Sequence, residues 1–175
     1  MKNIFASAAI FVLSFVFMSL GTANAVGLSN VFPAFSSRNL DGEPVTGDIF
    51  SREKLTMVNI WTTWCPPCIR EMPDLGRLAR SMPEGAQLVG IVLDVEGTGD
   101  TKTIDDAKRI MSTAKADFLQ ILPSEEMTPV LRTVRAIPTT IFVNSNGQII
   151  GAPVVGAKDE KGYRAELERR LQSLK

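Results

Sequence analysis

The chain has 175 residues, of which 45% are hydrophobic and 22% charged, an ordinary composition for one globular domain. Its 19 basic and 19 acidic side chains cancel, so the charge does not favour nucleic acid or an anionic membrane surface as a partner. The sequence contains no histidine, which excludes Cys–His and Ser–His catalysis and every His-ligated metal site.

Residues 1–25 have the pattern of a secretory signal peptide. Lys2 is their only charge, Ile10 to Met18 is an apolar run, and Ala23-Asn24-Ala25 matches an A-x-A cleavage pattern. The alternative is an uncleaved membrane anchor, because Ile4 to Leu20 is nearly long enough to span a bilayer. Either interpretation predicts an exported, periplasmic or extracytoplasmic protein, which is membrane-anchored if the segment is retained.

The first half of the predicted domain leads from a β-hairpin to a helix. Val31 to Thr46 reads as a hairpin around the turn dipeptide Asp41-Gly42. A single helical turn at 51–54 precedes an apolar strand at 57–61. A helix should then run from about Cys65 to Arg80.

The start of that helix holds both cysteines of the chain, Cys65 and Cys68, separated by Pro66 and Pro67. A disulfide that closes so small a loop restricts the unfolded chain little, so the pair is better explained by chemistry than by stability. Prolines are tolerated in the first turn of a helix, which places the Cys65 sulfur near unpaired N–H groups and the positive end of the helix dipole. A thiolate, the nucleophilic form, is stabilised there, and Cys68 lies one turn away.

The second half of the chain alternates predicted strands and helices. The predicted elements are a strand at Leu88–Leu93, a helix at Thr103–Ala114 capped by Thr103, a strand at Phe118–Leu122, a short helix at Thr128–Arg135, a hairpin of Ile141–Val143 with Gln148–Ile150, and a closing helix at Asp159–Leu174. This alternation predicts an α/β domain over residues 26–175, with a mainly parallel sheet to which the last hairpin adds antiparallel strands.

The segment Trp64-Cys65-Pro66-Pro67-Cys68 resembles the active site of the thioredoxin superfamily. The extended motif through Glu71 and Pro73 is similar to the TlpA/ResA group of extracytoplasmic thiol-disulfide oxidoreductases, as are Asn59 and the N-terminal hairpin. The resemblance covers about residues 31–172. It implies a thioredoxin fold, with a central mixed sheet flanked by helices and an N-terminal β-hairpin extension.

A second motif, Ile137-Pro138 followed by two threonines, resembles the superfamily segment whose proline is cis and faces the cysteines. The alternative is an ordinary turn before a strand. The residue before a cis-proline can offer its backbone groups to an extended substrate, as in strand addition. The resemblance therefore predicts a substrate-binding surface made of Trp64, Pro66, Pro67, Ile137 and Pro138.

Glu71 has two interpretations. It is either a surface residue of the helix, or an acid that lies one turn from Cys68 and exchanges a proton with it. Its negative charge would also oppose the helix dipole and raise the pKa of a nearby thiol.

The resemblance implies an enzyme that reduces specific protein disulfides, such as those of apocytochrome c or a metallochaperone, without a cofactor. Cys65 would attack the substrate, Cys68 would resolve the mixed disulfide, and a membrane thiol-disulfide electron donor would reduce the pair again. We expect a monomer. The alternatives are a disulfide-forming oxidant or isomerase on the same fold, a copper(I)- or zinc-binding module, and a peroxidase.

Overall fold

The computed structural model describes residues 30–174. The segment assigned to the signal peptide lies outside these residues, so that assignment stays a prediction. Between residues 30 and 174 no helix has the length and apolarity needed to cross a bilayer.

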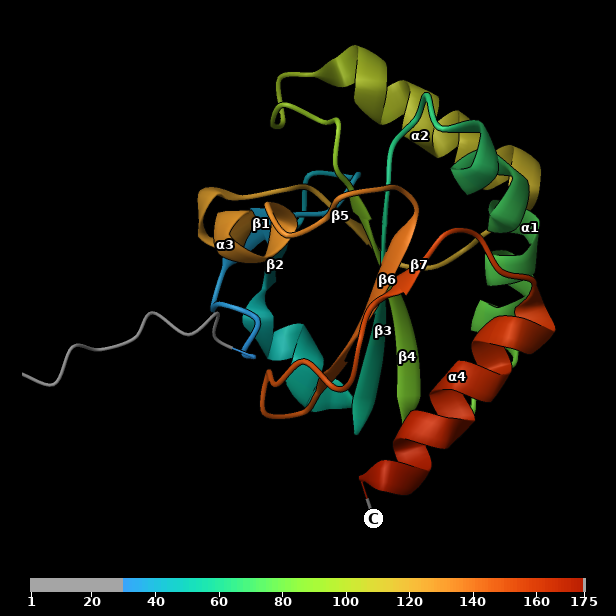
Figure 1. Cartoon of the computed structure of the whole chain (residues 1–175). Coiled ribbons are helices and arrows are strands. Elements are labelled where there is room, and N and C mark those ends of the chain that lie inside the picture. The colour runs from blue at the N-terminus through green and yellow to red at the C-terminus, as the bar shows by residue number, and fades with distance from the viewer. Residues whose placement is uncertain (1–29, 175) are drawn as a thin grey trace, which may run out of the picture.

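The described chain forms a mixed five-stranded sheet with helices on both faces, and a separate two-stranded hairpin (Figure 1). Its elements are β1 (Ser36–Arg38), β2 (Pro44–Thr46), η1 (Gly47–Arg52), β3 (Leu55–Trp61), α1 (Pro66–Arg80), β4 (Ala86–Val92), α2 (Thr101–Ala114), β5 (Gln120–Ile121), η2 (Glu125–Met127), α3 (Thr128–Leu131), β6 (Thr139–Asn144), β7 (Val154–Val155) and α4 (Glu160–Ser173). The thioredoxin fold expected from the sequence is confirmed.

The central strand of the sheet is β3, in the order β5-β4-β3-β6-β7. It pairs in parallel with β4 and antiparallel with β6, and all seven of its residues are buried. A strand covered on both faces can be apolar throughout, which is why the predicted strand reads as a nearly continuous hydrophobic run. The cysteines follow directly from this strand.

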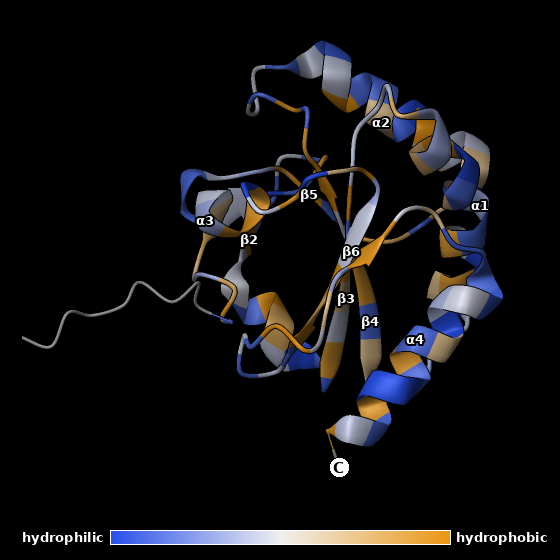
Figure 2. Ribbon diagram, viewed as in Figure 1, coloured by the Kyte–Doolittle hydropathy of each residue, from blue (hydrophilic) through white to orange (hydrophobic). Residues whose placement is uncertain are grey.

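Each face of the sheet has its own hydrophobic core. Helices α1, α2 and α4 cover one face and bury Trp61, Met72 and Phe142 with both cysteines. The N-terminal segment, η1 and α3 cover the other face (Figure 1). Figure 2 shows hydrophobic residues concentrated on the strands, while the outward faces of the helices are hydrophilic.

The N-terminal hairpin covers the β5 edge of the sheet. The Leu122 N–H donates to the Arg38 carbonyl at 2.9 Å, and the Ser37 hydroxyl donates to the Leu122 carbonyl at 2.7 Å. Asn39 forms an isolated bridge with Ile121. An open edge exposes unpaired backbone groups, so the hairpin protects the sheet there.

Two helix starts differ from the sequence prediction. The cap of α2 is Asp100 and not Thr103, because the Asp100 carboxylate accepts the Thr103 N–H at 3.2 Å. The bonds from Thr103 hold the pKa of Asp100 below its usual value. The helical turn expected at 51–54 is instead the 3-10 helix η1, which begins at Gly47.

The hairpin predicted after β6 is confirmed in part. Ile149 forms an antiparallel bridge with Val143, and the Ile150 N–H donates to the Phe142 carbonyl at 2.7 Å, but Gln148–Ile150 makes isolated bridges only, and the edge strand β7 lies at Val154–Val155. Gly151 adopts a positive φ of 71°, which interrupts the extended chain. Helix α3 and strand β5 are also shorter than predicted.

Candidate active site

Cys65 and Cys68 form a disulfide at the N-terminus of α1. Cys65 is the residue before the helix, Pro66 begins it, and the Cys68 N–H donates to Cys65 Sγ at 3.2 Å. Both cysteines are buried in this oxidised state, but Cys65 retains 3% of its surface whereas Cys68 retains none. Cys65 is therefore slightly more accessible than Cys68, and its role as the attacking cysteine stays a prediction.

Pro138 lies beside the disulfide. The Ile137–Pro138 peptide bond is cis, and the Ile137 carbonyl oxygen lies 3.8 Å from Cys65 Sγ. A disulfide sulfur carries no hydrogen, so this is a contact and not a hydrogen bond. The Pro138 carbonyl accepts the Gly156 N–H at 2.8 Å, which joins this segment to the end of β7. The cis geometry is as expected, while the binding role of the segment stays a prediction.

The rim of the site is apolar and exposed. Trp64 has 69% of its surface exposed, and Pro66 is also exposed. Pro67 and Ile137 are partly buried, and Pro138 is buried. The five predicted substrate-binding residues thus belong to the two segments that meet at the disulfide, the start of α1 and the segment before β6.

Two further apolar side chains, Ile69 and Val155, are exposed near this rim. Ile69 lies in the first turn of α1, and Val155 pairs with Thr139 next to Pro138. The sequence prediction missed both. Ile69 belongs to the motif by position, but Val155 comes from β7, a strand that the sequence did not predict.

Glu71 is buried, with 3% of its surface exposed, so the interpretation as a surface residue is wrong. Its Oε1 accepts the Asn59 side-chain N–H at 2.9 Å, and its Oε2 accepts the Tyr163 hydroxyl at 2.8 Å and the Lys158 backbone N–H at 3.3 Å. Burial raises the pKa of Glu71, and these three hydrogen bonds only partly oppose that effect. Proton exchange with Cys68 stays a prediction.

The residues around Glu71 form a polar cluster inside the core. Asn59 also donates to the Thr140 hydroxyl at 3.2 Å, and that hydroxyl lies 3.4 Å from the Tyr163 hydroxyl. Burial and the nearby Glu71 charge raise the pKa of Tyr163, so it remains a neutral donor. Asn59 Oδ1 has no hydrogen-bond partner among the described residues. The sequence indicated Asn59 and Glu71, but it gave Tyr163 only a packing role.

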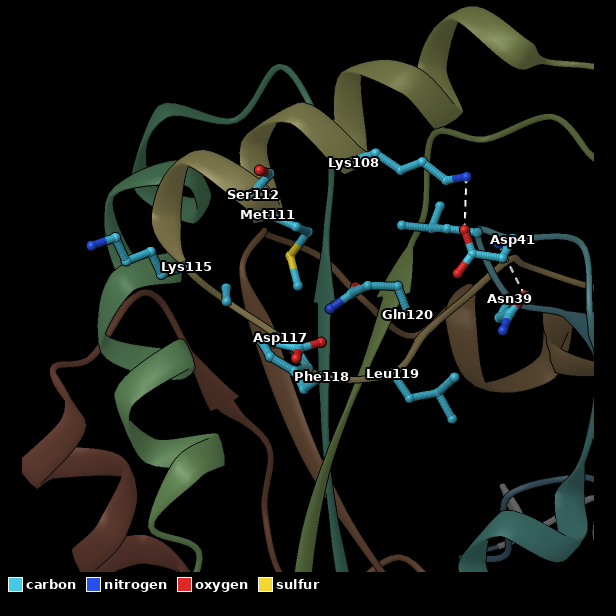
Figure 3. Close-up of a pocket in the computed structure, with 12 residues that line it drawn as sticks. Asn39, Asp41, Lys108, Met111, Ser112, Lys115, Asp117, Phe118, Leu119 and Gln120 are labelled. Carbon is cyan, nitrogen blue, oxygen red and sulfur yellow. Dashed lines mark hydrogen bonds and ion pairs between the residues drawn. The ribbon is translucent and has the colours of Figure 1, made fainter.

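A hollow of about 420 Å³ lies away from this site, between α2, β5 and the N-terminal hairpin (Figure 3). Lys108 and Asp41 form an ion pair of 2.8 Å at its rim. Gln120 on its floor accepts the Trp61 indole N–H at 2.9 Å, which anchors the end of β3. Neither cysteine nor Glu71 lines the hollow, so the chemistry is elsewhere.

Metal ligands are scarce in the described part of the chain. No group of three or more Cys, Asp or Glu side chains is placed to share a metal ion there. The arrangement at the disulfide suits two-electron exchange between sulfur atoms.

The chain is similar to known proteins in family, sequence and structure. The model of the Redoxin family matches residues 28–167. The chain is 25% identical over 130 residues to sporulation thiol-disulfide oxidoreductase A of Bacillus subtilis, covering 74% of this chain and 76% of that protein. It is 26% identical over 175 residues to the thiol:disulfide interchange protein DsbE of Pseudomonas aeruginosa, covering 98% and 91%.

Among solved structures, a thiol:disulfide interchange protein of the thioredoxin family from Chlorobium tepidum superposes with a TM-score of 0.66. That likeness covers 81% of this chain and 95% of the other, at 22% identity, and it supports the fold. Fold, dithiol and family match agree: the chain belongs to the Redoxin family and is a thiol-disulfide oxidoreductase of the TlpA/ResA type within the thioredoxin superfamily.

Proposed function

We propose that this protein is an extracytoplasmic reductant of specific protein disulfides. The observation that carries the exchange chemistry is the position of Cys65, while the direction is argued from Glu71 below. Its sulfur accepts a backbone N–H at the start of α1, beside the cis-proline segment. In the reduced protein that N–H and the helix dipole favour the Cys65 thiolate, which is the attacking form.

The reaction takes two exchange steps. The Cys65 thiolate attacks one sulfur of the substrate disulfide, breaks the S–S bond and releases the other sulfur as a thiolate. Cys68, once deprotonated, attacks Cys65 Sγ, which forms the Cys65–Cys68 disulfide and releases the second substrate thiolate. Two electrons pass to the substrate, and a membrane thiol-disulfide donor returns them. We propose that Glu71 accepts the proton that Cys68 loses, because burial raises the pKa of Glu71 and makes it a better proton acceptor than an exposed glutamate.

The substrate surface consists of Trp64, Pro66, Pro67, Ile137 and Pro138. The exposed apolar rim suits an extended peptide that contains the disulfide, bound by strand addition at Ile137. An unfolded apocytochrome c or the flexible cysteine loop of a metallochaperone has that form.

The direction of the reaction rests on Glu71. A strong oxidant needs a strongly stabilised thiolate, and a carboxyl group one turn from Cys68 opposes thiolate formation whenever it is ionised. Equilibration with glutathione tests this argument. We expect a potential nearer that of thioredoxin, about −270 mV, and a value near the oxidant end, about −120 mV, would favour the alternative function of disulfide formation.

Replacement of each cysteine tests the order of attack. We expect Cys65→Ser to abolish reduction of disulfides and Cys68→Ser to accumulate mixed disulfides, because Cys68 resolves them. Alkylation of the two single variants provides the control. Faster labelling of the remaining Cys68 than of the remaining Cys65 would reverse the assigned roles.

Export is part of the proposal. We infer that residues 1–25 direct the chain out of the cytoplasm and that the mature protein acts as a monomer. Mass spectrometry of the exported protein should find Val26 at its N-terminus. A retained segment would support the membrane-anchored form, and sedimentation would measure the oligomeric state.

A further inference from the structure

The turn between β3 and α1 presents Trp64 and Cys65, and main-chain pairing with β4 ends just before it. The Leu93 N–H donates to the Trp61 carbonyl at 2.8 Å, beyond the last paired residues of the two strands. Inside the turn, the Cys65 N–H donates to the Thr62 carbonyl at 3.3 Å. The Thr63 N–H lies between these bonds and needs another acceptor.

Asp94 supplies that acceptor. Its two carboxylate oxygens lie 3.2 and 3.1 Å from the Thr63 N–H, and one of them accepts the Thr63 hydroxyl at 2.6 Å. Thr63 and Asp94 are both partly buried, so water competes less for these bonds than it would at an open surface. Bonds to an ionised acceptor are stronger than neutral ones. One side chain at the end of β4 therefore clamps the residue next to Trp64.

Packing holds the buried residues on either side of Trp64 but not the Trp64 side chain. The indole is 69% exposed, so hydrophobic contacts hold it weakly, and its direction follows the backbone of the turn. Thr63 and Cys65 are its two neighbours. The bonds of Asp94 thus restrain the backbone on which the exposed indole and the reactive sulfur are both carried.

We propose that Asp94 is a positioning residue for disulfide exchange with protein substrates. Acting through Thr63, its carboxylate holds Trp64 and Cys65 in the geometry that a peptide disulfide must meet. The proposal rests on the proposed reductase function. It adds a residue that determines specificity and lies outside the Cys-x-x-Cys motif, two positions after the end of β4.

The proposal predicts that loss of the Asp94 bonds affects peptide substrates but not small disulfide reagents. A peptide disulfide uses the rim formed by Trp64, so a loosened turn should raise its KM. A small reagent such as 5,5′-dithiobis(2-nitrobenzoate) needs only the Cys65 sulfur and should react as before. A merely structural bond would lower the melting temperature without producing this difference.

Four variants test the idea. Asp94→Ala removes the clamp, and Asp94→Asn keeps its shape if the alanine variant does not fold. Thr63→Val removes the hydroxyl bond alone, while Thr63→Ser keeps it. Asp105→Ala is the matched control, because Asp105 is an exposed carboxylate of α2 whose loss changes the net charge equally.

The substrate is a synthetic peptide with an oxidised Cys-Ala-Ala-Cys-His segment, reduced by the full chain. Asp94→Ala should raise its KM about tenfold, Asp94→Asn and Thr63→Val about threefold, and the small reagent should change less than about twofold, since charge-assisted bonds exceed neutral ones. Thr63→Ser and Asp105→Ala should match the parent protein. Equal KM values in Asp94→Ala and Asp105→Ala would overturn the proposal.

A second measurement distinguishes a failure of the proposed reductase function from a failure of the positioning role of Asp94. If the parent protein reacts with the small reagent but does not reduce the peptide, the proposed substrate class fails. The role of Asp94 is then tested by the anisotropy of tryptophan fluorescence, to which the exposed Trp64 and the buried Trp61 both contribute. Asp94→Ala should lower that anisotropy and Asp105→Ala should not, and an unchanged value in both variants refutes the positioning role.

Discussion

Arg170→Met should destabilise the protein strongly although Arg170 lies far along α4 from the cysteines. The guanidinium is buried, with 3% of the side chain exposed, and lies 3.8 Å from the centre of the Phe142 ring. It donates to the carbonyls of Ile150 at 3.3 Å, Ala152 at 2.8 Å and Glu166 at 3.3 Å, and it forms an ion pair with the Glu166 carboxylate. Methionine keeps most of the stem but can neither donate these bonds nor interact as a cation with the ring.

The expected loss follows from these contacts. Three hydrogen bonds to carbonyls, each near the lower end of the usual range, one buried cation–π contact and a small contribution from the ion pair with Glu166 together amount to about 3 kcal/mol. For a domain of this size that loss lowers the melting temperature by roughly 6–12 °C. Because Ile150 and Ala152 lead into β7, the segment that borders Pro138 should also loosen.

Urea unfolding and thermal melting measure the effect. The matched control is Arg169→Met, because Arg169 is 65% exposed and pairs with Glu166 alone at 2.7 Å, a contact worth about 0–1 kcal/mol. Equal losses in the Arg169 and Arg170 variants would refute the argument that the buried guanidinium organises the connection to β7.

Two further predictions concern buried polar groups. Glu71→Gln should fold, since the Asn59 amide can turn its unpartnered oxygen toward the new NH₂ group, and it should remove the Glu71 inflection from the rate–pH profile. Because the folded-state pKa of Glu71 is raised, ionisation costs stability as the pH rises from the usual glutamate value through the folded one, so the variant should gain stability over the parent across that window. The difference in urea midpoint between Glu71→Gln and the parent protein should therefore be larger above this pH window than below it, and the same difference at both ends would contradict the argument. Gly90→Ala should cost about 2–4 kcal/mol, because its Cβ would collide with the Gln120 amide that binds Trp61, whereas Gly99→Ala, which faces open space, should be neutral by the same measurement.

Local patterns determined much of the molecule. The apolar run of β3 needs a sheet covered on both faces, and the two prolines after Cys65 specify a helix start whatever surrounds them. A few adjacent residues were therefore enough to predict the cysteine pair and to predict which of the two stands at the start of the helix. The cis bond before Pro138 was expected from resemblance, because a local sequence does not distinguish the two isomers.

Tertiary structure decided what depends on residues far apart in the chain. Glu71 looks like a surface residue in the helix pattern, yet α4 and the loop before it enclose the carboxyl through Tyr163, 92 positions away. Asp94 and Thr63 meet because β3 and β4 pair in parallel, which aligns their ends across 31 positions. Propensity and periodicity report on neighbours along the chain. Burial, charge and hydrogen bonding at this site are set by which strand ends and helices the sheet brings together, and that arrangement exists only once the chain has folded.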